Sequence, residues 1–522
     1  MNRPFKFCIL AAGRGTRNES LRGLHKALLP VGNRAALSII IEKVDKSVPI
    51  VVALGHQAEQ VRTYLEYVHP DRIFEFVYVE NYQGPGSGPG LSLLKCEKNL
   101  QCPFIFTSAD TIVDGETPFS GVKKNWAGVS QISNSESHEY CLVKINGKLI
   151  ENFFYGNNEE AHAFTGIGGV YEFKKFWNGL RQGNVIRGEH QVLDGLRALA
   201  ALHRYNMSWL DTGNTRSYTR TKLFYPNNAA IEKDNEAIFI DNGRVVKYFE
   251  DPLRARKRIL RSDKLGEAAP TITKINDNMF GYRYVEAQTL SEVYNKEIFL
   301  GFLRNYERTF RATNYEKDDR FLENCRKMYR EKTFNRVERF VGDPLDSVKV
   351  INGVSVKPIK NLLTMIDWES IYQKAIPSPF HGDMQPENIL ILPDNGYLYI
   401  DWRESFGESL DSGDAYYDLG KLYHALKISN NLILNGDYEV NFNTDQVDIQ
   451  YTLKNNLYEF SETLKDFCCT NMYDFDHVCL LGILNYLNIA SLYNKFEDGK
   501  YGKFLFLLGK KLLTQHLEKN NG

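Results

Sequence analysis

One short stretch constrains this chain more than any other. Residues 380–390 read Phe-His-Gly-Asp-Met-Gln-Pro-Glu-Asn-Ile-Leu, and an apolar run, a turn at 393–396 and a second apolar run follow. This order predicts a loop, a strand, a hairpin turn and a second strand. Asp383 and Asn388 then lie in the loop, and Asp401 lies after the second strand, where it can return to the same place. Such a set suits phosphoryl transfer, because one carboxylate can accept the proton of an attacking hydroxyl while an amide and a second carboxylate hold Mg²⁺ on nucleotide phosphates.

The same stretch resembles the catalytic core of the aminoglycoside phosphotransferase and choline kinase families, which are built on the protein-kinase scaffold. The resemblance implies that Asp383 is the catalytic base, that Asn388 and Asp401 bind the metal, and that His381 braces the loop. The alternative is a surface hairpin whose Asp and Asn side chains only form turns. The combined pattern is more specific than a single glycine-rich loop, which favours the catalytic interpretation.

Length and charge bound the possibilities. A chain of 522 residues exceeds one ordinary core, so two or three domains are expected. A net charge of -1 gives no basic field for nucleic acid, and no apolar run is long enough to span a bilayer. The first 12 residues do not resemble a signal peptide, and the eight cysteines have no paired spacing. We therefore expect reduced thiols, no membrane insertion and a cytoplasmic protein.

A second motif lies at the N-terminus. The apolar run 5–10 predicts a strand that leads into Ala-Ala-Gly-Arg-Gly-Thr-Arg at 11–17. Small residues there let the backbone approach a ligand and turn N–H groups toward phosphate oxygens, and two arginines add positive charge. Lys26 follows, just before the apolar segment 27–31. A strand followed by such a loop is weak evidence alone, and a structural turn is the alternative.

Together these residues resemble the nucleotidyltransferase family that makes sugar nucleotides and the bacterial CDP-choline precursors. The implied fold is a Rossmann-like α/β domain with a mostly parallel sheet, and segments 36–44, 49–54, 58–68 and 73–79 alternate accordingly between helix and strand patterns. The implied reaction is attack of a phosphate monoester on the α-phosphorus of a nucleoside triphosphate. Lys26 would neutralise charge there. The residues implied to hold the triphosphate are Ala12, Gly13, Arg14, Gly15 and Arg17.

Further site residues follow from the same resemblance. In the glycine-rich loop 83–90, the candidates for closing around the base are Gln83, Gly84 and Ser87, and a flexible loop is the alternative. Asp110 ends a strand pattern, where open α/β sheets place ligand-binding groups, and it is well placed for Mg²⁺. Asp211 is the second carboxylate implied, with a plain helix cap as the alternative.

The acceptor side departs from the family pattern. The glycine-bearing segment 164–171 resembles the strand that lines the acceptor pocket. Sugar-nucleotide members often carry Glu-Lys-Pro after the preceding strand, whereas here Phe153, Phe154 and Tyr155 occupy that neighbourhood. Because aromatic faces can hold an ammonium group, this favours an amino alcohol ester over a sugar 1-phosphate. Arg403, two residues after Asp401, favours instead a substrate that bears a carboxylate or hydroxyls.

The second half carries the remaining kinase-like features. A hairpin at 237–249 resembles the kinase small lobe and gives Lys247 the role of the phosphate-binding lysine. The helix expected at 251–264 has no glutamate to pair with Lys247, and its basic residues are interpreted as a solvated face. Amphipathic patterns follow at 291–313 and 320–333, as a helical large lobe requires. The backbone implied to meet adenine is that of Val285 and Glu286, and the residues implied to be structural are Asp414 and Asp418.

These features combine into one hypothesis. The chain is expected to hold a nucleotidyltransferase domain at 1–225 and an α+β protein-kinase-like domain at 236–522. The second would phosphorylate a small alcohol such as choline or ethanolamine with ATP, and the first would couple the ester to a nucleotide, with CTP preferred, for a surface glycan or lipid. Mg²⁺ or Mn²⁺ is implied at both sites. A sugar kinase joined to a sugar-1-phosphate nucleotidyltransferase is the alternative, and a regulatory nucleotide binder with one inactive domain is the third. The sequence leaves homo-oligomer formation open.

Overall fold

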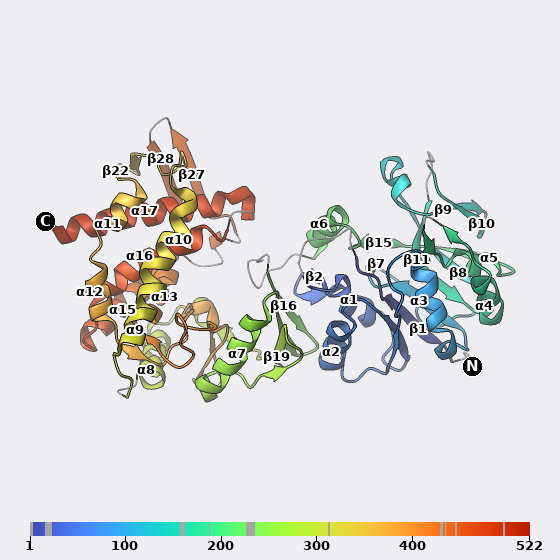
Figure 1. Ribbon diagram of the computed structural model, residues 1–522, viewed down its shortest axis with the longest axis horizontal. Coiled ribbons are helices and arrows are strands. Elements are labelled where there is room, and N and C mark those ends of the chain that lie inside the picture. The colour runs from blue at the N-terminus through green and yellow to red at the C-terminus, as the bar shows by residue number, and fades with distance from the viewer. Residues whose placement is uncertain are drawn as a thin grey trace. The chain divides into compact units, whose positions relative to one another are not determined.

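Figure 1 shows the computed structural model of the chain. It describes residues 4–15, 23–156, 162–186, 188–225, 235–311, 314–428, 432–433, 435–443, 446–493 and 496–521. The chain forms two compact units, the first made of Met1–Pro252 with Thr273–Tyr284 and the second of Leu253–Ile272 with Val285–Gly522. Among the described residues, no helix combines the length and apolar character that a membrane crossing requires.

A nine-stranded sheet forms the centre of the first unit. Its strands run in the order β5, β4, β1, β6, β11, β8, β14, β10, β9. Their bounds are β5 (Phe74–Tyr78), β4 (Ile50–Leu54), β1 (Lys6–Ala11), β6 (Phe104–Ser108), β11 (His162–Val170), β8 (Trp126–Gln131), β14 (His203–Asn206), β10 (Leu149–Phe154) and β9 (Leu142–Asn146). Continuous apolar runs form β1 and β4, as strands that are covered on both faces require.

The expectation of a mostly parallel sheet is only partly correct. Strands β5, β4, β1 and β6 pair in parallel, and β14 pairs in parallel with β8. In contrast, β11 pairs antiparallel with β6 and β8, and β10 pairs antiparallel with β14 and β9. The short connection between β9 and β10 permits only an antiparallel hairpin, whereas the parallel half is joined by helical crossovers. The sheet is therefore mixed.

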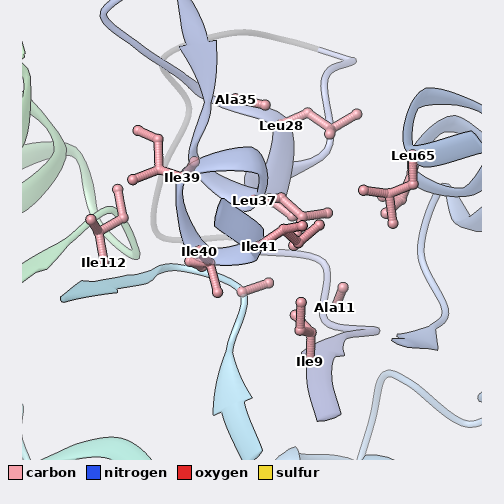
Figure 2. Close-up of a cluster of buried hydrophobic side chains, with 14 of the residues drawn as sticks. Ile9, Ala11, Leu28, Ala35, Leu37, Ile39, Ile40, Ile41, Leu65 and Ile112 are labelled. Atoms are coloured by element: carbon pink, nitrogen blue, oxygen red, sulfur yellow. The ribbon is translucent and has the colours of Figure 1, made fainter. Parts of the chain in front are cut away.

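Helices follow the strands of the parallel half, as the alternating pattern predicts. They are α1 (Ala36–Glu42), α2 (Ala58–Val68) and α3 (Pro89–Lys95), with α4 (Phe173–Arg181), α5 (Leu193–Arg197) and α6 (Thr215–Phe224) later in the chain. Figure 2 shows one core of this unit, where apolar side chains of α1 gather with Ile9 and Ala11 of β1 and Leu65 of α2. The shorter elements are β2 (Pro30–Val31), β3 (Arg34–Ala35), β7 (Thr111–Asp114), β12 (Val185–Ile186), β13 (Glu189–His190), β15 (Ser208–Asp211) and the 3₁₀ turns Lys26–Leu28, Glu97–Asn99 and Asn134–Glu139.

A second, four-stranded sheet also belongs to the first unit. It runs in the order β16, β17, β19, β18, with bounds β16 (Glu236–Asp241), β17 (Arg244–Phe249), β19 (Met279–Arg283) and β18 (Thr273–Lys274). The predicted hairpin is confirmed, since β16 and β17 pair antiparallel around a turn at Asn242 and Gly243, both with positive φ. Phe239 and Tyr248 of this sheet are buried in the same core as α1 and α2, and the Phe239 ring packs edge-on against that of Tyr64.

Polar contacts also attach this sheet to β3 and α2. Asp241, at the end of β16, lies 3.2 Å from the Arg34 guanidinium. The Asn242 side-chain amide donates a 2.8 Å hydrogen bond to the carbonyl of Val68, where α2 ends. Across β19, a Cβ built on Gly281 would lie 2.4 Å from the Tyr67 ring, so only glycine permits this approach. The hairpin of β16 and β17 is thus packed against α2 and β3 of the first unit.

The second unit is rich in helices. They are α7 (Pro252–Leu265), α8 (Lys296–Phe310), α9 (Asp319–Arg326), the π-helical segment Lys327–Glu331, α10 (Lys332–Val337), α11 (Ile359–Thr364), α12 (Trp368–Lys374), α13 (Ala415–Lys427), α15 (Asn455–Thr470), α16 (Phe475–Ala490) and α17 (Lys500–Asn521). The predicted amphipathic segments correspond to α8, α9 and α10. Helix α16 packs against both α13 and α17.

Three small sheets complete the second unit. The strands are β20 (Gln288–Thr289), β24 (Ile389–Ile391) and β25 (Tyr397–Tyr399) in one sheet, β22 (Val354–Ser355), β21 (Val350–Ile351), β28 (Gln446–Tyr451) and β27 (Tyr438–Asn443) in another, and β23 (Pro377–Ser378) with β26 (Gly413–Asp414) in the third. The 3₁₀ turns are Gly266–Ala268, Leu290–Glu292, Glu338–Phe340, Pro386–Asn388 and Phe496–Gly499. The loop, strand, turn and strand predicted around residues 380–402 are confirmed by the turn Pro386–Asn388 followed by β24 and β25.

The interpretation of α7 as a solvated basic helix is wrong for two of its arginines. Arg258 is 5% exposed and Arg261 is 1% exposed. Arg261 donates a hydrogen bond to the carbonyl of Phe380, and its guanidinium lies 3.6 Å from the centroid of the Phe380 ring. Charge counts alone gave no sign of this, because a guanidinium can be buried where carbonyls, rings and carboxylates receive it.

Candidate active sites

The candidate catalytic loop of the second unit is held by a buried carboxylate. Asp418, on α13, accepts hydrogen bonds from the backbone N–H groups of His381 (2.7 Å) and Gly382 (2.6 Å). The His381 ring lies 2.9 Å from the carbonyl of Ile400, so it joins the loop to the end of β25. Burial raises the pKa of Asp418 to about 7, although both backbone donors favour its ionised form. Asp418 therefore shapes the loop, and His381 lies where a bracing residue would.

Asp383 and Asn388 are brought together in this loop. The Asn388 side-chain amide donates to the carbonyl of Asp383 at 2.9 Å, and the Gln385 amide donates to Asp383 Oδ1 at the same distance. Lys421 Nζ lies 3.2 Å from Asp383 Oδ1. Because the Asn388 amide donates through its nitrogen, its oxygen is left as an acceptor, which is the atom a metal ligand needs.

Asp401 lies beside Asn388 and pairs with an arginine. It follows β25 with a φ of +59°, and the preceding backbone N–H, of Ile400, donates to the carbonyl of Asn388 at 2.9 Å. Arg258 Nη1 lies 2.6 Å from Asp401 Oδ1, and Arg258 Nη2 lies 3.5 Å from a carboxylate oxygen of Glu404. A positive group thus already occupies the neighbourhood in which Asp401 would meet a metal. Asp401 and Asn388 supply the oxygen ligands that Mg²⁺ prefers, so the residues fit this ion.

The other kinase-like candidates lie in different surroundings. Lys247 is buried in β17, in register with Ile238 and Phe280, and belongs to the first unit. Val285 and Glu286 begin the segment of the second unit that follows Tyr284. Asp414 is buried and caps α13, and burial raises its pKa to about 6. This placement agrees with a structural part for Asp414.

In the first unit, Lys26 lies along the glycine loop that follows β1. Gly15 has a φ of +69°, and a Cβ built there would lie 2.8 Å from Lys26 Cδ. A Cβ on Gly13 would lie 3.9 Å from Lys26 Nζ. Ala12 is buried and Arg14 is exposed, whereas Arg17 lies outside the described residues. The lysine stem therefore occupies the space that a side chain at Gly15 would fill.

The head of Lys26 reaches Asp110 at the carboxyl end of β6. Lys26 Nζ donates to Asp110 Oδ2 at 2.7 Å, and the Ser108 hydroxyl donates to Asp110 Oδ1. Burial acts to raise the pKa of Asp110, but the charge of Lys26 and the hydrogen bonds from Lys26 and Ser108 outweigh it and lower the pKa to about 2. Asp110 is consequently ionised at neutral pH.

Asp211 is the second carboxylate of this site. It ends β15, where it pairs in register with Thr111, the residue after Asp110. A Cβ built on Gly213 would lie 3.0 Å from Asp211 Oδ1 and 3.2 Å from Asp110 Oδ2, so both carboxylates border one small space. Burial, and next the charge of Asp110, raise the pKa of Asp211. Two nearby carboxylates that repel each other fit a divalent cation, and their oxygens suit Mg²⁺ or Mn²⁺.

The predicted base-binding loop is tied to a hairpin. The Ser87 carbonyl accepts from the backbone N–H of His190 at 2.8 Å, and Gly86 N–H donates to the carbonyl of Gly188 at 2.9 Å. Gln83 and Gly84 are exposed between β5 and α3. These backbone contacts to β12 and β13 were not visible in the sequence, because turn residues give no sign of their distant partners.

The aromatic residues predicted near the acceptor are arranged differently. Phe153 is 3% exposed and packs edge-on against the ring of Phe164 in the core. Phe153 therefore offers no face to a ligand, because strand alternation turns it inward. Tyr155 also packs against this core. The aromatic residue beside the carboxylates is instead Tyr140, whose hydroxyl donates to Asp211 at 3.3 Å.

Comparisons with known proteins point to the N-terminal region. No protein-family model matches the chain. The bifunctional protein GlmU of Trichormus variabilis is 33% identical over 130 residues, which is 21% of this chain and 28% of that protein. GlmU of Methanococcus aeolicus is 23% identical over 218 residues, 39% of this chain and 50% of that protein. The chain thus spans half or less of the length of these curated relatives.

Solved structures match a similar share of the chain. The CTP:phosphocholine cytidylyltransferase LicC of Streptococcus pneumoniae is 16% identical, with a TM-score of 0.35, over 43% of this chain and all (100%) of that chain. The N-terminal region, which carries the motif around Gly13 and Lys26, is thus similar in sequence to the bifunctional proteins GlmU.

Several residues of both sites were not predicted from the sequence. In the first unit they are Ser108 and Tyr140, which bond the two carboxylates. In the second unit Arg258 bonds Asp401, and Lys421 bonds Asp383. Lys421 follows Asp418 by one helical turn, and this spacing could have signalled that both face the loop. No local pattern could have signalled Arg258, because its partner lies 143 residues away.

Proposed function

We propose that the first unit is a nucleotidyltransferase. The observation that carries this proposal is Lys26, which lies along the glycine loop and bonds Asp110 while Asp211 borders the same space. In the reaction, an oxygen of a phosphate monoester attacks the α-phosphorus of a nucleoside triphosphate, the bond from that phosphorus to the bridging oxygen breaks, and pyrophosphate leaves. Lys26 and the loop N–H groups face the phosphates and stabilise the charge that develops on them. A divalent ion held by Asp110 and Asp211 would supply further positive charge on the phosphates.

We propose that the second unit is a small-molecule kinase. Support comes from the loop in which Asp383 and Asn388 are bonded to each other and Asp401 lies beside them. Asp383 would accept the proton of the attacking hydroxyl, and its contact with Lys421 keeps it oriented. Asn388 and Asp401 would hold a divalent ion that neutralises nucleotide phosphates. The backbone of Val285 and Glu286, which belongs to the same unit, would meet the adenine of the nucleotide.

The two activities combine into a sequence of steps. The kinase uses ATP to make a phosphate monoester from a small alcohol, and the nucleotidyltransferase activates that ester, with CTP as the preferred nucleotide, for a surface glycan or lipid. Choline and ethanolamine are one class of alcohol, but the burial of Phe153 removes part of the reason for preferring them. A sugar kinase joined to a sugar-1-phosphate nucleotidyltransferase is the second candidate, and Arg403 beside the catalytic loop favours an acceptor with hydroxyls or a carboxylate.

A direct test uses the purified full chain. Each nucleoside triphosphate is supplied with a panel of phosphate esters, and pyrophosphate release is measured. ATP is supplied with a panel of small alcohols, and ADP formation and product mass are measured. Pyrophosphate release that depends on one ester, together with ADP formation that depends on one alcohol, supports both proposals. A chain that binds nucleotides but releases neither product would contradict them.

A further inference from the structure

A group of cations surrounds the catalytic carboxylate of the second unit. Lys421, on α13, lies 3.2 Å from Asp383. Arg403 follows β25, and its backbone N–H donates to the carbonyl of His381 at 2.9 Å, which joins it to the catalytic loop. A Cβ built on Gly382 would lie 2.5 Å from Arg403 Cβ, so the stem of Arg403 packs directly on the loop backbone. The backbone and the Cβ of Arg403 are therefore held against the loop that carries Asp383.

The hydroxyl of Tyr417 contacts two cations of this group. Tyr417 lies one helical turn before Lys421 on α13, and its hydroxyl oxygen accepts from Lys332 Nζ at 3.2 Å and from Arg403 Nη1 at 3.5 Å. Arg336 follows Lys332 by four residues on α10, so both project from the same face of that helix. Burial lowers the pKa of Arg336, and the charges of Arg403 and Arg254 act in the same direction.

The cations of this group outnumber the carboxylates beside them. Arg254 and Arg258 are matched by Glu404 and Asp401. Glu404 also lies 4.0 Å from Arg403, and Asp383 lies 3.2 Å from Lys421. Within the part of the chain that the structure describes, no carboxylate lies within ion-pair distance of Lys332 or Arg336. Partly buried cations that exceed their counter-ions are costly unless an anion joins them.

The titration of the phenol agrees with a positive local field. Burial acts to raise the pKa of Tyr417, but the charges of Arg403, Lys332 and Lys421 outweigh it and lower the pKa to about 8. Burial, with the charges of Arg403 and Lys421, lowers the pKa of Lys332 to about 8 as well. Both shifts favour the less positive form of each group, which is the response expected where cations crowd together.

We propose that the alcohol phosphorylated by the second unit carries a carboxylate or a phosphate, which Lys332, Arg336 and Arg403 bind while its hydroxyl meets Asp383. The inference rests on the kinase function proposed above. The hydroxyl oxygen attacks the γ-phosphorus of ATP, the bond from that phosphorus to the β–γ bridging oxygen breaks, and ADP leaves with the bonding electrons. Asp383 takes the hydroxyl proton. A bare ammonium group would meet like charges at this place, so choline and ethanolamine are poor acceptors.

The test compares alcohols of matched size and different charge. The full chain is given ATP and Mg²⁺ with glycerate, glycerol phosphate, glycerol or serinol, and ADP formation is measured. We expect kcat/KM to be highest for glycerate or glycerol phosphate, lower by about 10- to 100-fold for glycerol, and lowest for the cationic serinol. The two anionic alcohols distinguish a carboxylate from a phosphate.

Variants assign the effect to the cations. Lys332→Ala and Arg336→Ala should each raise KM for the preferred anionic alcohol by about tenfold or more with a smaller change in kcat, and Lys332→Arg should restore it. The matched control is Arg330→Ala, since Arg330 is exposed on the adjoining π-helical segment. The melting temperature and pyrophosphate release by the first unit show whether each variant is folded.

The outcomes separate this inference from the kinase proposal. ADP formation with serinol, choline or glycerol at a higher kcat/KM than with either anionic alcohol overturns the inference and leaves the kinase standing. An increase of KM for ATP, with KM for the alcohol unchanged, also overturns it, because the cations would then serve the nucleotide. No ADP with any alcohol removes the kinase proposal and the inference together.

Discussion

Lys26 donates a 2.7 Å hydrogen bond to Asp110, which lies 84 residues later in the chain. This bond joins the glycine loop after β1 to the carboxyl end of β6, the two neighbouring strand ends at which an open α/β sheet binds its ligands. The low pKa of Asp110 follows from it. The lysine and the carboxylate therefore act as a pair, and loss of either charge should impair the site.

The two activities should separate by mutation. Asp110→Asn should lower nucleotidyl transfer by about 10²-fold or more and leave ADP formation intact, because the carboxylate belongs to the first unit alone. Asp383→Asn should do the reverse. Both rates are measured on each variant, with melting curves to confirm folding. Loss of both activities in a folded Asp383→Asn protein would show that the two sites are not independent.

A methyl group on the glycine loop should impair the first site through Lys26. Gly15→Ala places a Cβ within 2.8 Å of Lys26 Cδ and should lower nucleotidyl transfer by about tenfold or more, since the lysine head is displaced. Gly147→Ala is the matched control, because its φ of +59° imposes a similar backbone cost and nothing lies within 4 Å of the added Cβ. Equal activities of the two variants would exclude a steric effect on Lys26.

Removal of Arg258 should make the second unit depend on Mg²⁺. Without its guanidinium, Asp401 and Glu404 lose a shared cation, and Arg258→Met should cost about 1–3 kcal/mol of stability. A divalent ion at Asp401 then recovers part of this loss. Melting curves with and without Mg²⁺ should show a larger increase for Arg258→Met than for the wild type or for Arg256→Met, which changes an exposed arginine of the same helix.

Binding of an anionic alcohol should weaken as the pH rises through about 8. Below this pH Lys332 is cationic and Tyr417 is neutral, and above it each loses a proton, so the positive charge of the site falls. Arg336 and Arg403 remain charged, and Lys421 keeps its charge because its pKa is raised, with Asp383 opposing the effect of burial. KM for glycerate should increase between pH 7 and 9, whereas KM for glycerol should not. A flat profile for glycerate would count against Lys332 as an anion ligand.

The kinase step should precede the nucleotidyl step, although its unit lies second in the chain. The nucleotidyltransferase reaction needs a phosphate nucleophile, which the kinase makes from a hydroxyl. With ATP alone the phosphorylated alcohol should accumulate, and addition of CTP should consume it with release of pyrophosphate. Mass spectrometry of timed samples follows both species. A nucleotide product formed from the free alcohol without ATP would reverse this order.

Local patterns predicted much of what the structure contains. Apolar runs predicted β1, β4 and β6, and the turn at 241–243 predicted the hairpin of β16 and β17. Such elements can be predicted because they depend on residues that are neighbours in the chain. The mixed half of the large sheet was not predicted, since pairing partners such as β8 and β14 are set by distant contacts. Lys26, Asp110 and Asp211 do meet, and so do Asp383 and Asn388.

What the sequence missed were long-range partners and the direction of side chains. Phe153 was expected to face a ligand, but its register in β10 turns it into the core. Arg258 was interpreted as part of a solvated face, because nothing near it in the chain shows the carboxylate that it approaches. Site electrostatics arise from residues on several elements and therefore appear only when the chain is folded.

The packing of β16, β17 and β19 on α2 has a consequence for modularity. The chain crosses between its two units after Pro252, after Ile272 and after Tyr284, so the unit that carries the nucleotidyltransferase-like sheet also owns Lys247. A protein truncated at residues 226–235 would lose part of one hydrophobic core, and Tyr64 and Tyr67 would no longer be covered by the four-stranded sheet. The boundary between the two proposed activities is thus not a suitable point for separating the chain into two proteins. A chimaera has to keep the four-stranded sheet of β16 to β19 with the N-terminal part.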